Sequence, residues 1–211
     1  MKKAEILQRF HGLYGIADAE VARFGDPVRL ARQLLDGGCR LLQFRAKKLS
    51  KDEIRISGTE ILAECQRYGA VLILNDHAEI AASIGAHGVH LGQLDGTVAA
   101  AREIVGKESV IGRSTNHVLQ LREAVAEADY VAFGPVFPTA NAGRPKRVRG
   151  LVGLNEARGF VPAHRPLVAI GGITETNLFS VVAAGADSWA VIGAIANAPD
   201  PIAATKRLLK G

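Results

Sequence analysis

The sequence contains few cysteines, few aromatic residues and no long apolar run. Of its 211 residues only two are cysteines, and 5% are aromatic. Cys39 and Cys65 cannot form a disulfide framework or a CxxC metal site, so we expect both to be reduced packing residues. The apolar runs fall short of the roughly 18 to 20 residues that cross a bilayer, which excludes a transmembrane helix. Charged residues interrupt the first fifteen positions, so we expect a cytoplasmic protein without a secretory signal.

The charge balance is mildly basic, and the excess is concentrated in one segment. Lys and Arg number 26 against 21 Asp and Glu, a net charge of +5. Residues 138–153 contain Arg144, Lys146, Arg147 and Arg149 and no acidic residue. A small phosphorylated molecule would be a sufficient partner for such a segment. Because aromatic side chains for base stacking are scarce, we expect no nucleic-acid partner.

Short apolar runs rich in β-branched residues alternate with segments of helical spacing. The predicted strands are 13–18, 40–45, 70–76, 88–92, 110–114, 130–135, 167–171 and 188–193. The predicted helices are 27–35, 50–68, 78–84, 97–105, 118–127, 154–160, 175–184 and 199–209, with a short helix at about 3–10. Eight units of about 26 residues predict a single-domain α/β fold, a (β/α)8 TIM barrel over residues 1–211. A doubly wound sheet is the alternative, but glycines and polar residues at nearly every strand end favour a barrel mouth.

Polar side chains follow the second predicted strand. In an extended segment, the period of two places Gln43, Arg45 and Lys47 on one side. Three such residues facing inward are difficult to bury without a charged ligand, which favours a polyanion site. An exposed basic edge is the alternative interpretation.

Two carboxylates follow the next two strands. Asn75 and Asp76 end the third strand, and Asp95 follows the fourth. Carboxylates on adjacent strand ends repel each other unless a metal lies between them, and oxygen ligands beside a phosphate favour Mg²⁺. A helix cap is the alternative role for Asn75 and Asp76. His90, inside the fourth strand, is expected to be a hydrogen-bonded core histidine.

Small residues follow the last two strands. Gly171 and Gly172 end the seventh strand and Gly193 ends the eighth. Without side chains at these positions, backbone N–H groups can approach a phosphate monoester. Many barrels share this feature, so it indicates a phosphate ligand without specifying which one.

Seven motifs in order resemble the thiamine phosphate synthase family, which includes a related thiazole tautomerase branch. They are QFRAK at 43–47, LND at 74–76, GVHLGQLD at 88–95, GRS at 112–114, ADYVAFGPVFPT at 128–139, AIGGIT at 169–174 and GADSWAVIGAI at 185–195. The resemblance implies a Mg²⁺-dependent transferase of thiamine biosynthesis. Its reaction would condense aminopyrimidine methyl diphosphate with hydroxyethylthiazole phosphate, giving thiamine phosphate and pyrophosphate.

The resemblance also implies a role for each matching residue. The catalytic residues would be Arg45, Lys47 and Ser114, with Mg²⁺ held by Asp76 and Asp95. The substrate-binding residues would be Gln43, Asn75, Thr139, Gly172, Ile192 and Gly193. The last three would hold the thiazole phosphate.

The sequence departs from the family pattern at a few positions. Asn141 and Ala142 replace a Thr and a Lys, and Asn116, followed by His117, replaces a His. These departures leave open a tautomerase-like enzyme, with His117 as acid or base, or a phosphate-ligand-binding paralogue without activity. In a synthase, Arg144 or Lys146 would supply the missing cation, from a loop whose glycine and proline favour a lid. The oligomeric state stays open.

Overall fold

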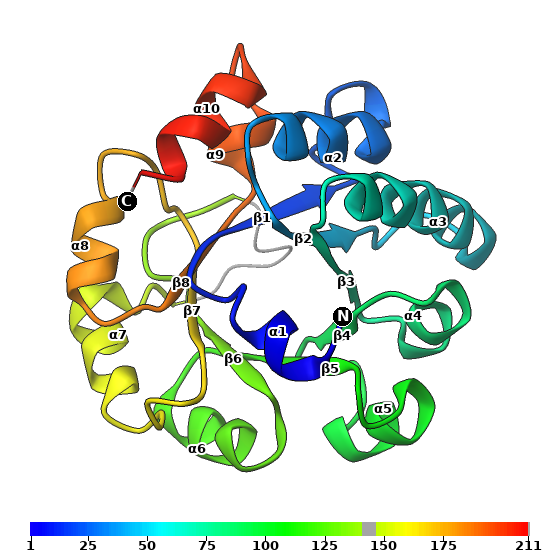
Figure 1. The fold of residues 1–211 in the computed structure, drawn as a ribbon. Coiled ribbons are helices and arrows are strands. Elements are labelled where there is room, and N and C mark those ends of the chain that lie inside the picture. The colour runs from blue at the N-terminus through cyan, green and yellow to red at the C-terminus, as the bar shows by residue number, and fades with distance from the viewer. Residues whose placement is uncertain (141–146, 211) are drawn as a thin grey trace.

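Eight parallel strands close into a barrel (Figure 1). The structure is a computed structural model that describes residues 1–140 and 147–210. Strand β1 (Gly12–Asp18) pairs with both β2 (Leu41–Arg45) and β8 (Ser188–Val191), so the sheet has no free edge. The other strands are β3 (Val71–Asn75), β4 (Gly88–Leu91), β5 (Val110–Thr115), β6 (Tyr130–Phe133) and β7 (Leu167–Ile170). The predicted (β/α)8 barrel is confirmed, and the doubly wound sheet is excluded.

Helices surround the strands, one after each, as Figure 1 shows. They are α2 (Pro27–Asp36), α3 (Lys51–Arg67), α4 (Ala78–Ile84), α5 (Val98–Val105), α6 (Val118–Glu127), α7 (Gly150–Arg158), α8 (Leu178–Ala183) and α10 (Pro201–Leu208). The sequence did not predict two short elements. They are η1 (Arg23–Gly25), between β1 and α2, and α9 (Gly193–Ala196), between β8 and α10. Within residues 1–140 and 147–210, no helix has the length and apolar character needed to cross a membrane.

The helix starts follow local capping chemistry. The Asp26 carboxylate accepts a hydrogen bond from the Arg29 N–H at 2.8 Å, which caps α2. Ser50 and Glu53 form a reciprocal capping box at the start of α3. Helix α8 begins at Leu178, later than predicted, because Asn177 bonds the loop before the helix rather than the helix itself.

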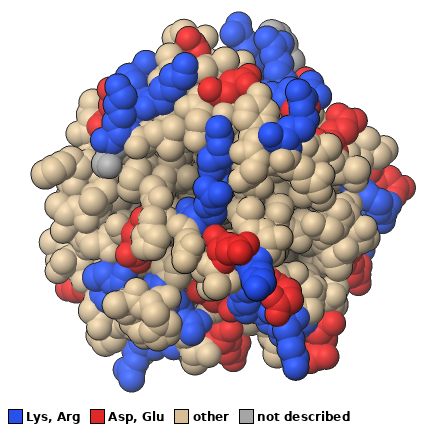
Figure 2. Space-filling view, in the orientation of Figure 1, with Lys and Arg blue, Asp and Glu red and all other residues tan. Residues whose placement is uncertain are grey.

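The short helix α1 (Lys3–Leu7) lies across the amino-terminal end of the barrel (Figure 1). It ends before residue 10, where the prediction ended it, and Phe10 is fully buried. The Phe10 ring packs against Tyr14 and Tyr130, with centroids 5.4 and 4.1 Å apart. Figure 2 shows this face of the molecule, where acidic and basic side chains are interspersed around the rim. The helix and the Phe10 ring therefore cover part of this end of the barrel.

Apolar residues form two separate layers, one inside the barrel and one between the strands and the helices. The inner layer includes Ile16, Leu41, Val71, Ile73, Val110 and Val168. The outer layer includes Cys39 and Cys65, which are free and buried as the sequence predicts. Successive residues of each strand therefore face the two layers in turn.

Candidate functional site

A cavity of about 560 Å³ lies at the carboxyl ends of the strands. All of the site residues expected from the sequence lie on its wall: Gln43, Arg45, Lys47, Asn75, Asp76, Asp95, Ser114, Thr139, Gly172, Ile192 and Gly193. They meet because parallel strands bring their carboxyl ends to one edge, and in a barrel that edge is a ring. The structure thus brings the residues together, and their individual roles stay predictions.

Polar side chains reach the cavity wall because the inward-facing positions change from apolar to polar toward the carboxyl ends of the strands. On β3 the inward positions are Val71, Ile73 and then Asn75, at the carboxyl end. On β5 they are Val110 and, four residues later, Ser114. The period of two carries the same face of each strand from the apolar interior to the cavity.

Two acidic residues hold Arg45. Its guanidinium donates to the Asp18 carboxylate and, at 3.2 Å, to Glu20. Glu20 also accepts hydrogen bonds from the backbone N–H groups of Lys47 and Lys48, at 2.8 and 3.2 Å. Burial raises the pKa of Asp18, although Arg45 opposes this shift. Of these three residues the sequence pattern identified only Arg45, because no strand pattern extends into the loop that carries Glu20.

A second cluster contains Asp76, which pairs with Lys47 and has Asp95 as a neighbour. The Lys47 ammonium lies 3.1 Å from Asp76 Oδ2, and Asp95 Oδ2 accepts from the Gly92 N–H at 2.9 Å. Burial is the main cause that raises the pKa of Asp76, and the neighbouring Asp95 adds to it. Asp76 has a φ of 68°, and no other non-glycine residue in the described ranges has a positive φ. Such a conformation is uncommon and is often found at functional sites.

The carboxylates fit a hydrated divalent cation. Asp76 Oδ1 is buried and accepts no hydrogen bond from any described residue, so it is a polar atom without a partner. In the described part of the chain, no group of three or more His, Cys, Asp or Glu residues could hold a metal. An octahedral ion bound by Asp76 and Asp95 would therefore need additional oxygen ligands from water or phosphate.

His90 is the hydrogen-bonded core histidine that the sequence predicts, and it also reaches the cavity wall. Its Nδ1 lies 2.9 Å from the Tyr130 hydroxyl and its Nε2 lies 2.8 Å from Ser114 Oγ. Burial lowers the pKa of His90 to about 4, and the charge of Arg113 contributes to the shift. At neutral pH the imidazole is therefore uncharged.

The glycines after β7 also have a structural role, besides the phosphate binding that the sequence suggests. Gly171 and Gly172 have φ values of 101° and 65°, which favour glycine. A Cβ on Gly172 would lie 2.5 Å from the Pro138 carbonyl oxygen, so it would collide with the loop after β6. Asn177 holds the loop after β7 in place. Its Nδ2 donates to the Gly172 carbonyl at 3.0 Å, and its Oδ1 accepts from the Thr174 N–H at 2.9 Å.

Some residues considered from the sequence do not join the described cavity wall. His117 is the N-cap of α6, where its Nδ1 accepts from the Gln120 N–H at 3.4 Å. This capping role accounts for it structurally. Asn141, Ala142, Arg144 and Lys146 lie outside the described residues.

Comparisons with known proteins agree on one family. The family described as Thiamine monophosphate synthase matches residues 13–195. A thiamine-phosphate synthase of Thioalkalivibrio sulfidiphilus is 40% identical over 204 residues, which cover 95% of each chain. One of Laribacter hongkongensis is 38% identical over 95% of this chain and 96% of its own. A solved thiamine phosphate pyrophosphorylase of Pyrococcus furiosus superposes with a TM-score of 0.87 at 33% identity, covering 97% and 96% of the two chains.

Proposed function

The chain belongs to the thiamine monophosphate synthase family, and we propose that the cavity at its strand ends is the site where thiamine phosphate is made. The protein is accordingly a transferase of thiamine biosynthesis. Its substrates would be aminopyrimidine methyl diphosphate and hydroxyethylthiazole phosphate, with pyrophosphate as the second product. Both substrates are small and phosphorylated, which agrees with the basic residues on the cavity wall.

One observation supports the proposal: a single cavity has two walls of different chemistry, each suited to a phosphate group. The wall from β2 to β4 presents Arg45 and Lys47 beside the carboxylates of Asp76 and Asp95. The wall from β7 and β8 presents the backbone around Gly172 and Gly193. A diphosphate needs concentrated positive charge, whereas a phosphate monoester can be bound by backbone N–H groups. The two substrates could therefore lie side by side.

The proposed chemistry depends on stabilising the leaving group. Departure of pyrophosphate leaves a carbocation-like methylene on the pyrimidine, so the barrier falls when charge on the leaving oxygens is neutralised. Arg45 and Lys47 lie on the wall where these oxygens would be, and Asp18 and Glu20 hold the Arg45 guanidinium in one orientation. Asp76 and Asp95 would hold Mg²⁺, which when bound supplies further positive charge to the phosphates.

The tautomerase alternative has no need of this acidic and basic wall, and the named relatives above are synthases or a pyrophosphorylase. The dependence on Mg²⁺ and the residue roles are part of the proposal. The cytoplasmic location expected from the sequence stays a prediction.

The direct test is to mix both substrates with the purified protein and Mg²⁺ and to measure thiamine phosphate by thiochrome fluorescence. We expect product only when both substrates are present, and we expect EDTA to stop its formation. Absence of product would overturn the proposed function. Arg144→Ala and Lys146→Ala, measured separately in this assay, test which basic residue replaces the family lysine: a loss of about tenfold or more in kcat would identify it.

A further inference from the structure

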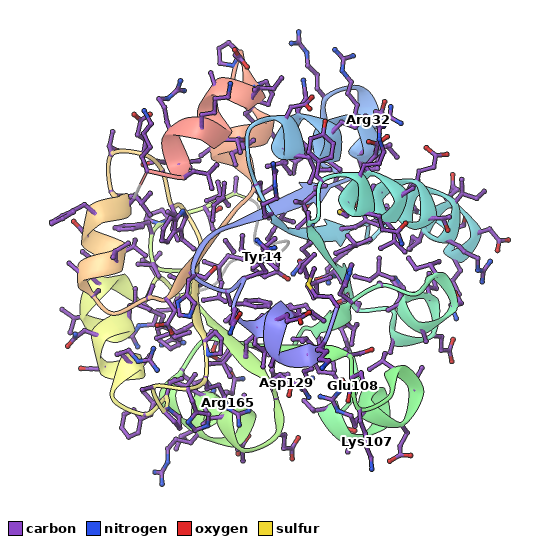
Figure 3. The ribbon with its side chains drawn as sticks, viewed as in Figure 1. Tyr14, Arg32, Lys107, Glu108, Asp129 and Arg165 are labelled. Carbon is purple, nitrogen blue, oxygen red and sulfur yellow. The ribbon has the colours of Figure 1, made fainter. Side chains whose placement is uncertain are left out.

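A row of hydrogen-bonded side chains crosses the barrel at the base of the cavity. Gln43 Nε2 donates to the Tyr14 hydroxyl at 3.0 Å, and the Tyr14 and Tyr130 hydroxyl oxygens are 2.9 Å apart. The Tyr130 hydroxyl is hydrogen-bonded to His90 Nδ1 at 2.9 Å, and His90 Nε2 is hydrogen-bonded to Ser114 Oγ at 2.8 Å. The five residues come from five different strands, and Figure 3 shows Tyr14 at the centre of the strand ring. We refer to them as the cross-barrel network.

The network is shielded from solvent. Tyr14 and Tyr130 are 1% and 0% exposed, and Gln43 and His90 are 4% and 6% exposed. Burial raises the pKa of both phenols far above neutral pH, so each hydroxyl keeps its single proton. Every contact in the network must therefore be made with the protons that these neutral groups already carry.

Counting the protons gives the network one direction. Because the Gln43 amide donates to Tyr14, the proton of Tyr14 must go to its other partner among the described residues, the Tyr130 oxygen. Within residues 1–140 and 147–210, the proton of Tyr130 then has only His90 Nδ1 as acceptor. If the last two links were reversed, His90 would donate to Tyr130, and one of the two buried phenol protons would have no acceptor among the described residues, which is unfavourable.

We propose that the cross-barrel network holds His90 as the tautomer protonated on Nε2, so that Ser114 accepts from His90 and directs its own hydroxyl proton into the cavity. Ser114 would then donate to an acceptor atom of the substrate, a ring nitrogen or a phosphate oxygen. Tyr130 never reaches the substrate in this arrangement, because its hydroxyl is occupied by Tyr14 and His90. It is a positioning residue that acts through His90 and Ser114.

The Tyr130 ring is held independently of its hydroxyl. A Cβ on Gly112 would lie 2.0 Å from Tyr130 Cζ, so the glycine leaves the space that the ring occupies. The ring also contacts Phe10, with centroids 4.1 Å apart. Tyr130→Phe can therefore retain the packing and remove only the hydrogen bonds to Tyr14 and His90.

The first test reads the tautomer of His90 by ¹⁵N NMR on protein labelled at histidine, without any substrate. The signal is assigned by its loss in His90→Gln. We expect the proton on Nε2 in the unmodified protein, and a large fraction on Nδ1 in Tyr130→Phe. Tyr68→Phe, on the outer helix layer, is the matched control and should leave the signal unchanged. A proton on Nδ1 in the unmodified protein would overturn the inference, whether or not the protein makes thiamine phosphate.

The second test is kinetic, and it alone depends on the proposed function. Tyr130→Phe should lower kcat about tenfold and leave both KM values within about twofold, because the donor is misdirected but the cavity is intact. In a Ser114→Ala background, the same change should have less than about a twofold effect, because the donor is already absent. If the kcat losses of the two single variants multiply in the double variant, Tyr130 does not act through Ser114, and its positioning role is refuted. Thermal unfolding of each variant separates these effects from loss of the fold.

Discussion

One carboxylate oxygen of Asp76 has no hydrogen-bond partner among the described residues, and the backbone of Asp76 has a conformation that few residues tolerate. Replacing it by Asn removes the charge but keeps a residue type that accepts a φ of 68°. The ion pair with Lys47 is lost, but the Lys47 side chain is 47% exposed, so this costs less than about 1 kcal/mol. Relief of the buried charge opposes the loss, since burial already raises the pKa of Asp76. We therefore expect the free energy of unfolding to change by no more than about 1 kcal/mol, roughly 2 to 4 °C in Tm.

Activity should respond very differently from stability. If Asp76 holds the cation, Asp76→Asn should lower kcat by at least about 10²-fold in the thiochrome assay. Asp76→Ala should be equally inactive and also less stable by about 1 to 2 kcal/mol, because alanine resists the left-handed conformation. Asp76→Gly should be inactive and keep its backbone without strain, although its unfolded state gains entropy.

This series separates the carboxylate from the backbone. Thermal unfolding and kcat are measured on the same preparations, with saturating substrates and Mg²⁺. The reasoning is refuted if Asp76→Asn keeps more than about a tenth of the wild-type kcat. It is also refuted if Asp76→Asn unfolds as readily as Asp76→Ala, since Asp76 would then be a structural cap.

Three further predictions follow from the same geometry. Gly172→Ala should destabilise the fold by about 2 kcal/mol or more in denaturant unfolding, because its Cβ would meet the Pro138 carbonyl and its φ is 65°; unchanged stability would contradict the observed loop contact. Gly193→Val should raise the KM for the thiazole phosphate much more than that for the diphosphate, and equal increases would place the monoester elsewhere. Between pH about 6.5 and about 4, the His90 side chain is protonated in the unfolded chain but stays neutral in the folded protein, where it is buried. The free energy of unfolding should therefore fall by about 3 kcal/mol as the pH decreases over this range. Urea unfolding should show that His90→Gln lacks this part of the pH dependence, whereas a substitution of exposed His11 retains it.

Local patterns were sufficient for the barrel and for the membership of the cavity wall. The strands carry short apolar runs bounded by glycine and polar residues, and the alternation with helices leaves few topologies open. Once the barrel is assumed, residues such as Arg45 and Asp95 must meet, because all the strand ends lie on one ring. Element ends were less accurate, as α8 and α1 show, because contacts from outside the segment decide where each helix begins or ends.

The sequence by itself determined the fold, the family and the side of the barrel that carries the chemistry, because each depends on periodicity and on motifs contiguous in the chain. Only the tertiary structure decided that Tyr14 and Tyr130, 116 residues apart, share a hydrogen bond beneath the cavity. It also decided that Gly172 is required by the approach of a neighbouring loop, and that Asp76 Oδ1 is left without a partner among the described residues. These features arise from long-range packing, in which distance, burial and proton count are set by parts of the chain that no local pattern connects.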